Sequence, residues 1–157
     1  MKKEYGLKPT IELLKIAEAA FVSTIGEDGY PDIRAMFNLR REAQFPGLAA
    51  VFEGHDEDHL LYFTTNTGSR KVGQIAKNPR VAVYYAVPSD FRGLSLAGDM
   101  EIVSDVETKR RIWQKGWELY YPGGVEDPDN AVLRLAPVRG IYYHRLAREE
   151  LIFKSKP

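Results

Sequence analysis

Residues 60–77, LLYFTTNTGSRKVGQIAK, decide the fold, because the hydrophobic period of the chain changes in the middle of this stretch. The first six residues are all apolar, aromatic or β-branched, as in a buried strand. Asn66 and Gly68 follow, and both tolerate the backbone of a tight turn. The later apolar residues recur at helical spacing, at Val72, Ile75 and Ala76. The stretch therefore predicts a buried strand that turns directly into a helix.

Three residues with anion-binding groups fall at the predicted start of this helix. Ser69 is a good N-cap, and Arg70 and Lys71 occupy the first helical turn. Cations there oppose the helix dipole, whose N-terminal end already has partial positive charge and free N–H groups. They make sense mainly if an anion is bound, so we interpret this turn as a phosphate site. The alternative is an ordinary Ser-capped helix with two solvated basic residues.

Length and charge limit the class of protein. The 157 residues suffice for one domain with a hydrophobic core, which we take as residues 1–157. Twenty-two basic residues balance 22 acidic ones, which argues against a broad nucleic-acid or anionic-membrane surface. No signal-peptide pattern is seen, and no run reaches the roughly 18 apolar residues of a spanning helix. We expect a cytoplasmic protein that binds neither nucleic acid nor membrane.

Alternation and turn residues predict further strands, at residues 21–25, 31–38, 80–87, 92–103, 131–136 and 139–145. Two more helices are predicted at residues 10–20 and 105–120, the second with Asp105 as N-cap. Most strands follow one another through short turns. We therefore expect a mainly β protein, a closed or half-closed antiparallel barrel of six or seven strands with about three helices.

Arg34 lies in the middle of the strand predicted at residues 31–38, on the same face as Asp32 and Met36. A mid-strand Arg usually faces water or pairs with an acid, and Asp32 is an available partner. The other interpretation is that Arg34 reaches the phosphate site. That requires its strand to neighbour the strand at residues 60–65.

The long connection at residues 39–58 contains an apolar run, residues 49–52, which we expect to form a short strand. His55 and His59 follow, four residues apart among carboxylates. This spacing would suit a metal on a helix, but Gly54 and the dense charge favour a solvated loop. We therefore expect no metal site.

Two apolar features have no assigned site. An aromatic stripe runs along the helix predicted at residues 105–120, at Ile112, Trp113, Gly116, Trp117 and Tyr120. Such a stripe favours a core or subunit contact over a cofactor site. The charged tail, residues 147–157, contains an apolar trio at residues 151–153 that is suited to docking on a neighbour.

With these residues placed, the chain resembles the pyridoxamine 5′-phosphate oxidase-like FMN-binding split barrels, most of all their small bacterial general-stress-protein branch. The resemblance covers about residues 19–144. It rests on several short motifs: Arg34-Ala35-Met36, Tyr62-Phe63-Thr64-Thr65-Asn66, Gly68-Ser69-Arg70-Lys71, Asn78-Pro79-Arg80-Val81-Ala82, Gly98-Asp99-Met100-Glu101, Tyr121-Pro122-Gly123-Gly124 and Leu135-Ala136-Pro137. Together these motifs are fairly specific, although no one of them is.

The resemblance implies an antiparallel six-stranded Greek-key split β-barrel and a homodimer with two FMN sites at its interface. The cofactor-binding residues that it implies are Arg34, Ala35, Met36, Thr64, Thr65, Ser69, Arg70, Lys71 and Tyr143. Arg34 and residues 69–71 would hold the FMN phosphate, and residues 64–65 would lie along the flavin. The chemistry of the turn agrees, since a dianionic phosphate prefers a helix N-terminus, a hydroxyl donor and guanidinium groups.

The chain departs from the oxidases of this family at several positions. Leu39 stands where they have a Lys, and Gly93 where they have a Gln that contacts the flavin. Tyr143 stands where the stress-protein branch commonly has a Trp. The Arg-x-His segment that grips the substrate in true pyridoxamine phosphate oxidases has no counterpart in residues 143–146. FMN binding is thus better supported than pyridoxamine phosphate oxidation.

The leading hypothesis is an FMN-dependent oxidoreductase that acts on a small molecule, with no catalytic residue identified. A reduced nicotinamide donor, NADH or NADPH, would need further cations for its phosphates, and Arg40, Arg41 and Arg92 are available. The alternative is a binding or stress-response module that holds FMN, a deazaflavin or haem without turnover. A non-flavin structural domain with a vestigial anion site is the third possibility.

Overall fold

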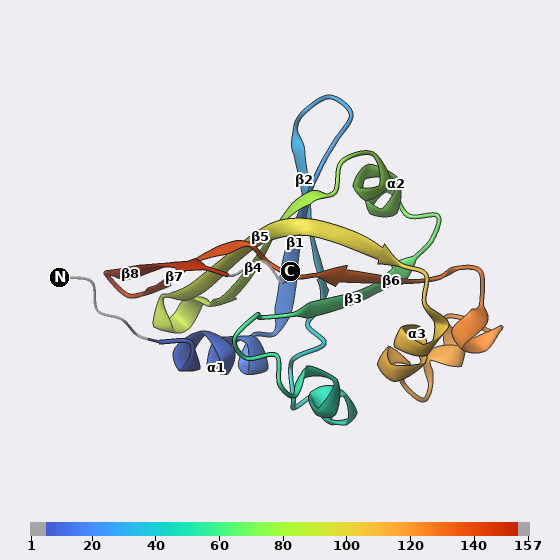
Figure 1. Ribbon diagram of the computed structural model, residues 1–157, viewed down its shortest axis with the longest axis horizontal. Helices are drawn as coiled ribbons and strands as arrows, with labels where there is room; N and C mark the ends of the chain where they lie inside the picture. Colours follow the sequence, from blue (N-terminus) through green and yellow to red (C-terminus); the bar gives the residue numbers. More distant parts are fainter. Residues whose placement is uncertain (1–5, 154–157) are drawn as a thin grey trace.

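The computed structural model describes residues 6–153, which form a curled antiparallel sheet with helices packed around it (Figure 1). The strands are β1 (Ala19–Ile25), β2 (Pro31–Phe37), β3 (Leu61–Asn66), β4 (Arg80–Val87), β5 (Arg92–Val103), β6 (Asn130–Leu135), β7 (Arg139–His144) and β8 (Ala147–Ile152). The α-helices are α1 (Lys8–Ile16), α2 (Arg70–Lys77) and α3 (Val106–Ile112). Short 3₁₀ segments are η1 (Pro46–Phe52), η2 (Pro88–Asp90), η3 (Trp117–Leu119) and η4 (Gly124–Glu126). These 3₁₀ segments were not expected, so the predicted helix count was slightly off.

The strand order explains why the barrel is split. The strands are hydrogen-bonded in the order β2-β1-β4-β5-β6-β3, and β7 pairs with both β5 and β8. All these pairs are antiparallel. β2 and β3 stand at the two ends of the order, and no ladder joins them within residues 6–153. The sheet is therefore a barrel that stays open between β2 and β3, which confirms the predicted fold class with eight strands instead of six.

The long strand β5 carries the change of partner that curls the sheet. It pairs with β7 as far as Ala97 and with β6 from Met100 onward. Gly98 lies at this change, and a Cβ atom there would be 3.0 Å from the carbonyl oxygen of Ala136 and 3.2 Å from Cα of Pro137. The missing side chain lets the β6–β7 connection pass closely over β5.

Two groups of buried side chains hold the elements together. The barrel interior contains fully buried residues from alternating strand positions, such as Val83 in β4 and Leu94 and Leu96 in β5. A second cluster lies where η1 and α3 pack on β3 and β6, and it includes Leu48 and Ile112. This second cluster fixes the 39–58 connection and α3 to the barrel. Within the described residues, no helix is long and apolar enough to cross a membrane.

The 39–58 connection differs from expectation in two ways. Residues 49–52 are not a strand but belong to η1, because Leu48, Val51 and Phe52 are buried at spacings of three and four. His59, which follows this connection, is not in a solvated loop. Its side chain is fully buried, and its Nε2 lies 2.6 Å from Thr10 Oγ1.

Two predictions for the C-terminal half are also corrected. Asp105 caps α3 as predicted, but the helix ends at Ile112, and Gly116, with φ of 99°, separates it from η3. The apolar trio at residues 151–153 was expected to dock on a neighbour, but two of its residues pack within their own chain. Leu151 and Phe153 are buried in the core of their own chain, because residues 147–152 form β8. The end of that tail, residues 154–157, lies outside the described residues.

Candidate functional site

A cleft with a volume of about 720 Å³ lies at the open seam of the barrel. One wall is β2, through Ala35, Met36 and Phe37, and the facing wall is the end of β3, through residues 64–66. Lys71 of α2 closes one end. Arg34 therefore belongs to a strand that faces β3 across this cleft, which is the arrangement that its interpretation as a phosphate ligand requires.

The β3–α2 turn supplies polar groups at one end of the cleft. Ser69 occupies the N-cap position of α2, as predicted, but its side chain makes no capping hydrogen bond. Its Oγ is buried and has no hydrogen-bond partner among the described residues. The Lys71 ammonium donates to Thr65 Oγ1 at 3.0 Å, so α2 and the end of β3 are tied together.

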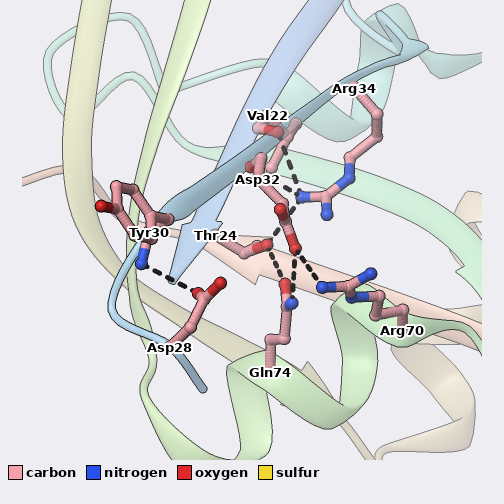
Figure 2. Close-up of polar contacts among 8 residues, drawn as sticks. All are labelled: Val22, Thr24, Asp28, Tyr30, Asp32, Arg34, Arg70 and Gln74. Atoms are coloured by element: carbon pink, nitrogen blue, oxygen red, sulfur yellow. Dashed lines mark hydrogen bonds and ion pairs between the residues drawn. The ribbon is translucent and has the colours of Figure 1, made fainter. Parts of the chain in front are cut away.

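A polar network joins Arg34 and Arg70, and Figure 2 shows both side chains pointing toward it from different elements. Arg34 Nη1 donates to Thr24 Oγ1 at 2.7 Å, and the Thr24 hydroxyl donates to Gln74 Oε1 at 2.5 Å. The Gln74 amide donates to Asp32 Oδ2 at 2.7 Å, and Arg70 Nη2 lies 3.2 Å from the same oxygen. The Asp32 carboxylate thus pairs with Arg70, while Arg34 contacts only its backbone carbonyl, at 3.3 Å.

The charges of this region affect one another's protonation. Burial lowers the pKa of Arg34, opposed by the Asp32 carboxylate and reinforced by the Arg70 cation. Burial, and then the charge of Arg34, lowers the pKa of Lys71. The Gln74 hydrogen bond is the main cause that lowers the pKa of Asp32, with smaller contributions from the two arginines. Three cations and one carboxylate therefore lie close enough to interact, which leaves a local excess of positive charge.

These groups fit the phosphate of a nucleotide cofactor. A buried hydroxyl without a partner costs free energy, so the Ser69 Oγ indicates a ligand that the chain itself does not provide. The first N–H groups of α2 have no acceptors within the helix, and they add to the excess of positive charge. The cleft beyond them offers the surface of residues 35–37 and 64–66 to the rest of such a cofactor.

Of the predicted cofactor residues, five line the cleft and four do not. The lining includes Ala35, Met36, Thr64, Thr65 and Lys71, whereas Arg34, Ser69, Arg70 and Tyr143 lie outside it. Tyr143 lies on β7, where its hydroxyl is hydrogen-bonded to that of Tyr84 and the two rings stack with centroids 6.5 Å apart. Burial and this hydrogen bond raise the pKa of Tyr84 to about 12. The pair also explains Gly93, because a Cβ atom at that position would lie 2.6 Å from the Tyr143 ring. Leu39 is buried and does not face the cleft.

Sequence reasoning missed the opposite wall and the polar support of the cleft. Trp117, Tyr120 and Tyr121 line the cleft, although the stripe that contains the first two favoured a core or subunit contact. Thr24 and Gln74, which connect the two arginines, were not singled out at all. Thr24 and Gln74 are polar residues at buried positions, which would have indicated a role in the site. Their burial could not be known from the sequence. Among residues 6–153, no group of three His, Asp or Glu side chains is placed to hold a metal ion.

Comparisons with known proteins point to one family. Residues 10–144 match the family described as pyridoxamine 5′-phosphate oxidase. A Clostridium acetobutylicum structure, described as related to general stress protein 26 of B. subtilis and of the pyridoxinephosphate oxidase family, is 33% identical over 96% of each chain, with a TM-score of 0.74. General stress protein 26 of Bacillus anthracis is 20% identical over 94% of this chain and 98% of that chain, with a TM-score of 0.70.

A more distant structure is a pyridoxamine 5′-phosphate oxidase-related, FMN-binding protein of Nostoc punctiforme. It is 16% identical over 96% of this chain and 90% of that chain, with a TM-score of 0.56, so this likeness concerns the fold. No curated protein matches the chain.

Proposed function

The chain belongs to the pyridoxamine 5′-phosphate oxidase family, and from this premise we propose that it is an FMN-binding flavoprotein that acts as an oxidoreductase on a small molecule. Four of the motifs that suggested this family from the sequence, at residues 34–36, 62–66, 68–71 and 121–124, contribute residues to the lining of the cleft. The Nostoc punctiforme relative of the same fold is described as FMN-binding, which supports a flavin as the ligand of the cleft.

One observation carries the proposal: a buried hydroxyl without a partner among the described residues lies beside a cluster of cations at the N-terminus of α2. In this proposal Ser69 donates to the FMN phosphate, and Arg34, Arg70 and Lys71 supply the charge. A phosphate binds more strongly to guanidinium groups than a neutral ligand does, because such hydrogen bonds are charge-assisted. The Asp32 carboxylate, already held by Gln74, orients Arg70 toward the site.

The rest of the cofactor would lie along the cleft between the two edge strands. Ala35 and Met36 offer it backbone and apolar surface on β2, and Thr64 and Thr65 offer hydroxyl and backbone groups on β3. When bound, FMN supplies the redox chemistry, and the protein supplies binding, orientation and electrostatics. Leu39 and Gly93, which replace residues used by true oxidases of this family, disfavour pyridoxamine phosphate oxidation itself.

We also propose that the cofactor site is completed by a second copy of the chain. Ala35 and Phe37 line the cleft, and both are also on the exposed side of the β1–β2 hairpin. An interface on this hairpin would therefore cover the cleft. Tyr143 lies outside the cleft of its own chain, so in this arrangement it would contact the flavin held by the partner.

A haem-binding module is less well supported than a flavoprotein. His55 is paired with Asp58, His59 is buried against Thr10, and His144 lies 3.0 Å from Asp90. None of these three imidazoles lines the cleft at the seam. A module that holds FMN without turnover has the same cleft and differs only in its chemistry.

The experiment that tests the phosphate site compares the flavin content of purified variants by absorbance. We expect Arg34→Ala and Arg70→Ala to weaken FMN binding roughly ten- to a hundredfold, the value of one or two charge-assisted hydrogen bonds. Arg80→Ala removes an exposed cation on β4 that does not line the cleft, and should leave FMN occupancy unchanged. Full FMN occupancy in both Arg34→Ala and Arg70→Ala would refute the phosphate site.

A second measurement distinguishes the oxidoreductase from the carrier. If the flavin-loaded protein is an oxidoreductase that uses a nicotinamide donor, anaerobic NADH or NADPH bleaches its visible absorption. A yellow protein that neither nucleotide bleaches favours the non-catalytic module.

A further inference from the structure

The cleft extends well beyond the groups that the FMN phosphate would use. Arg34 marks the cation end of β2, and Phe37 lies three residues further on, about 10 Å away at the usual rise of a strand. Near this second end Glu18 directly precedes β1, and Arg41 and Gln44 follow β2 in the chain; the lining also includes the aromatic side chains of Trp117, Tyr120 and Tyr121. The cleft therefore has two chemically different ends.

Arg41 is the one cation that lines the second end among residues 6–153, and its side chain is free. The backbone around it is fixed, because its carbonyl accepts hydrogen bonds from the N–H groups of Gln44 and Phe45. Its guanidinium, however, has no hydrogen bond or ion pair within the described part of the chain, not even with Glu18, the carboxylate that also lines the cleft. Within residues 6–153, an unpaired guanidinium thus lines the cleft.

The other two arginines considered for an electron donor are already engaged. Arg40 is buried, and it donates to the carbonyl oxygens of Leu60 and His55 at 3.0 Å each. Arg92 donates to the carbonyl of Pro9 at 3.1 Å. Only Arg41 of the three lines the cleft, so its role is not duplicated by its neighbour.

The aromatic side chains of the lining offer flat apolar surface to a ligand. Trp117 packs edge-to-face against Phe45, with ring centroids 6.4 Å apart, and Phe45 packs in the same way against Phe37 at 5.8 Å. Tyr120 lines the cleft with 63% of its surface exposed and has no packing partner of its own among the described rings. A planar ligand can stack on such side chains, and each stacked pair adds about 0.5–1.5 kcal/mol beyond the area buried.

We propose that this second end of the cleft, formed by Arg41, Gln44, Trp117 and Tyr120, binds a small aromatic carboxylate as the second reactant. This proposal rests on the proposed function, since it takes the other end of the cleft for FMN. A carboxylate suits a single guanidinium, with which it can form two parallel hydrogen bonds. A dinucleotide has two or three phosphates and would need a cluster of cations, which this end does not provide.

The proposal can be tested by calorimetric titration of the FMN-loaded protein with 1-naphthoate and with its neutral counterpart, 1-naphthamide. Naphthoate is expected to bind more tightly than naphthamide. Arg41→Ala should weaken naphthoate binding about tenfold or more, and should leave naphthamide binding within about twofold. Tyr120→Ala should weaken both, because stacking does not depend on the charge. Arg139→Ala removes an exposed cation on β7 outside the cleft and should change neither.

The outcomes separate this proposal from the cofactor assignment, because flavin content is measured independently by absorbance. Loss of FMN in Arg41→Ala would overturn the proposal by assigning Arg41 to the cofactor. Equal affinity for the two naphthalenes, no binding of naphthoate, or a response of Arg41→Ala no larger than that of Arg139→Ala would also overturn it. If the protein takes up no FMN, the cofactor assignment fails and with it the role of the carboxylate as second reactant, while the same titrations of the flavin-free protein decide separately whether Arg41 binds a carboxylate.

Discussion

His59 shows how strongly one buried residue depends on its surroundings. The Thr10 hydroxyl donates to the carbonyl of Leu7, so the 2.6 Å contact with His59 requires Nε2 of the imidazole to be the donor. The ring also packs against Phe153, with centroids 4.9 Å apart. Burial, and then the charge of Arg40, lowers the pKa of His59 to about 4. The neutral imidazole is thus part of the joint between α1, β3 and the end of β8.

The lowered pKa of His59 predicts that the folded state loses stability in acid. An unfolded histidine has a pKa of about 6.5, so between pH 6.5 and 4 the unfolded chain binds more protons than the folded chain. Stability from this group is therefore complete above pH 6.5 and is lost as pH falls toward 4. The loss between pH 7.5 and 5 should be about 2 kcal/mol in the free energy of unfolding. Urea denaturation at the two pH values measures it.

The matched control for this prediction is the other histidine of the same segment. His59→Asn should lower stability at pH 7.5 but remove most of the pH dependence, and Asn tolerates the φ of 52° at this position. His55→Asn changes a partly exposed imidazole and should keep the dependence of the parent. Equal slopes in the two variants would mean that other groups cause the acid sensitivity.

At the scale of elements, two glycines give opposite predictions. A Cβ atom at Gly98 of β5 would press on the backbone of the β6–β7 connection, at 3.0 Å from the Ala136 oxygen. Gly98→Ala should therefore destabilise the fold by about 1–3 kcal/mol. Gly73 lies inside α2, and an added Cβ atom there would meet no other atom within 4 Å, so Gly73→Ala should stabilise the fold by about 0.5–1 kcal/mol. Thermal unfolding of both variants tests the pair, and two shifts of the same sign would contradict this account of β5.

Strands were predicted more accurately than helices, and the reason lies in what each pattern encodes. β4 and β5 begin and end at the predicted residues because both are framed by turn residues. The helix predicted at residues 105–120 ends at Ile112. The apolar spacing continues past Gly116, but the helical backbone conformation does not. The strand predicted at residues 49–52 is wrong, because four apolar residues alone do not distinguish a strand from a 3₁₀ segment.

The same contrast holds for the site. Residues 69–71 were predicted because cations at a helix N-terminus oppose local stability and so indicate a ligand. Thr24 and Gln74 were not, because their role arises only when β1, β2 and α2 pack together. Trp117 and Tyr120 reach the cleft because the chain turns at Gly116, which a straight helix would not allow. A sequence can therefore suggest a site through local chemistry, but it cannot show which side chains packing brings to the cleft.

At the scale of the whole molecule, the open seam leaves an unusual surface. Phe21, Ile33, Ala35 and Phe37 lie on one exposed face of the β1–β2 hairpin, since Phe21 pairs with Ala35 and the others alternate with it. β2 is also an edge strand. An exposed, apolar edge strand invites association unless something covers it. We expect a second copy of the chain to cover this face.

Ile33 is the best position for the test, because its side chain is 66% exposed and does not line the cleft. If the hairpin face is the interface, the parent protein sediments as a dimer and Ile33→Glu as a monomer, because a charge cannot be buried unpaired in an apolar contact. Ile152→Glu alters a residue on β8 that is 80% exposed, and it should leave the dimer intact. A monomeric parent, or a dimer that survives Ile33→Glu, would contradict this interface. If the interface also completes the cofactor site, the monomeric variant should hold less FMN than Ile152→Glu, even though Ile33 itself is no part of the cleft.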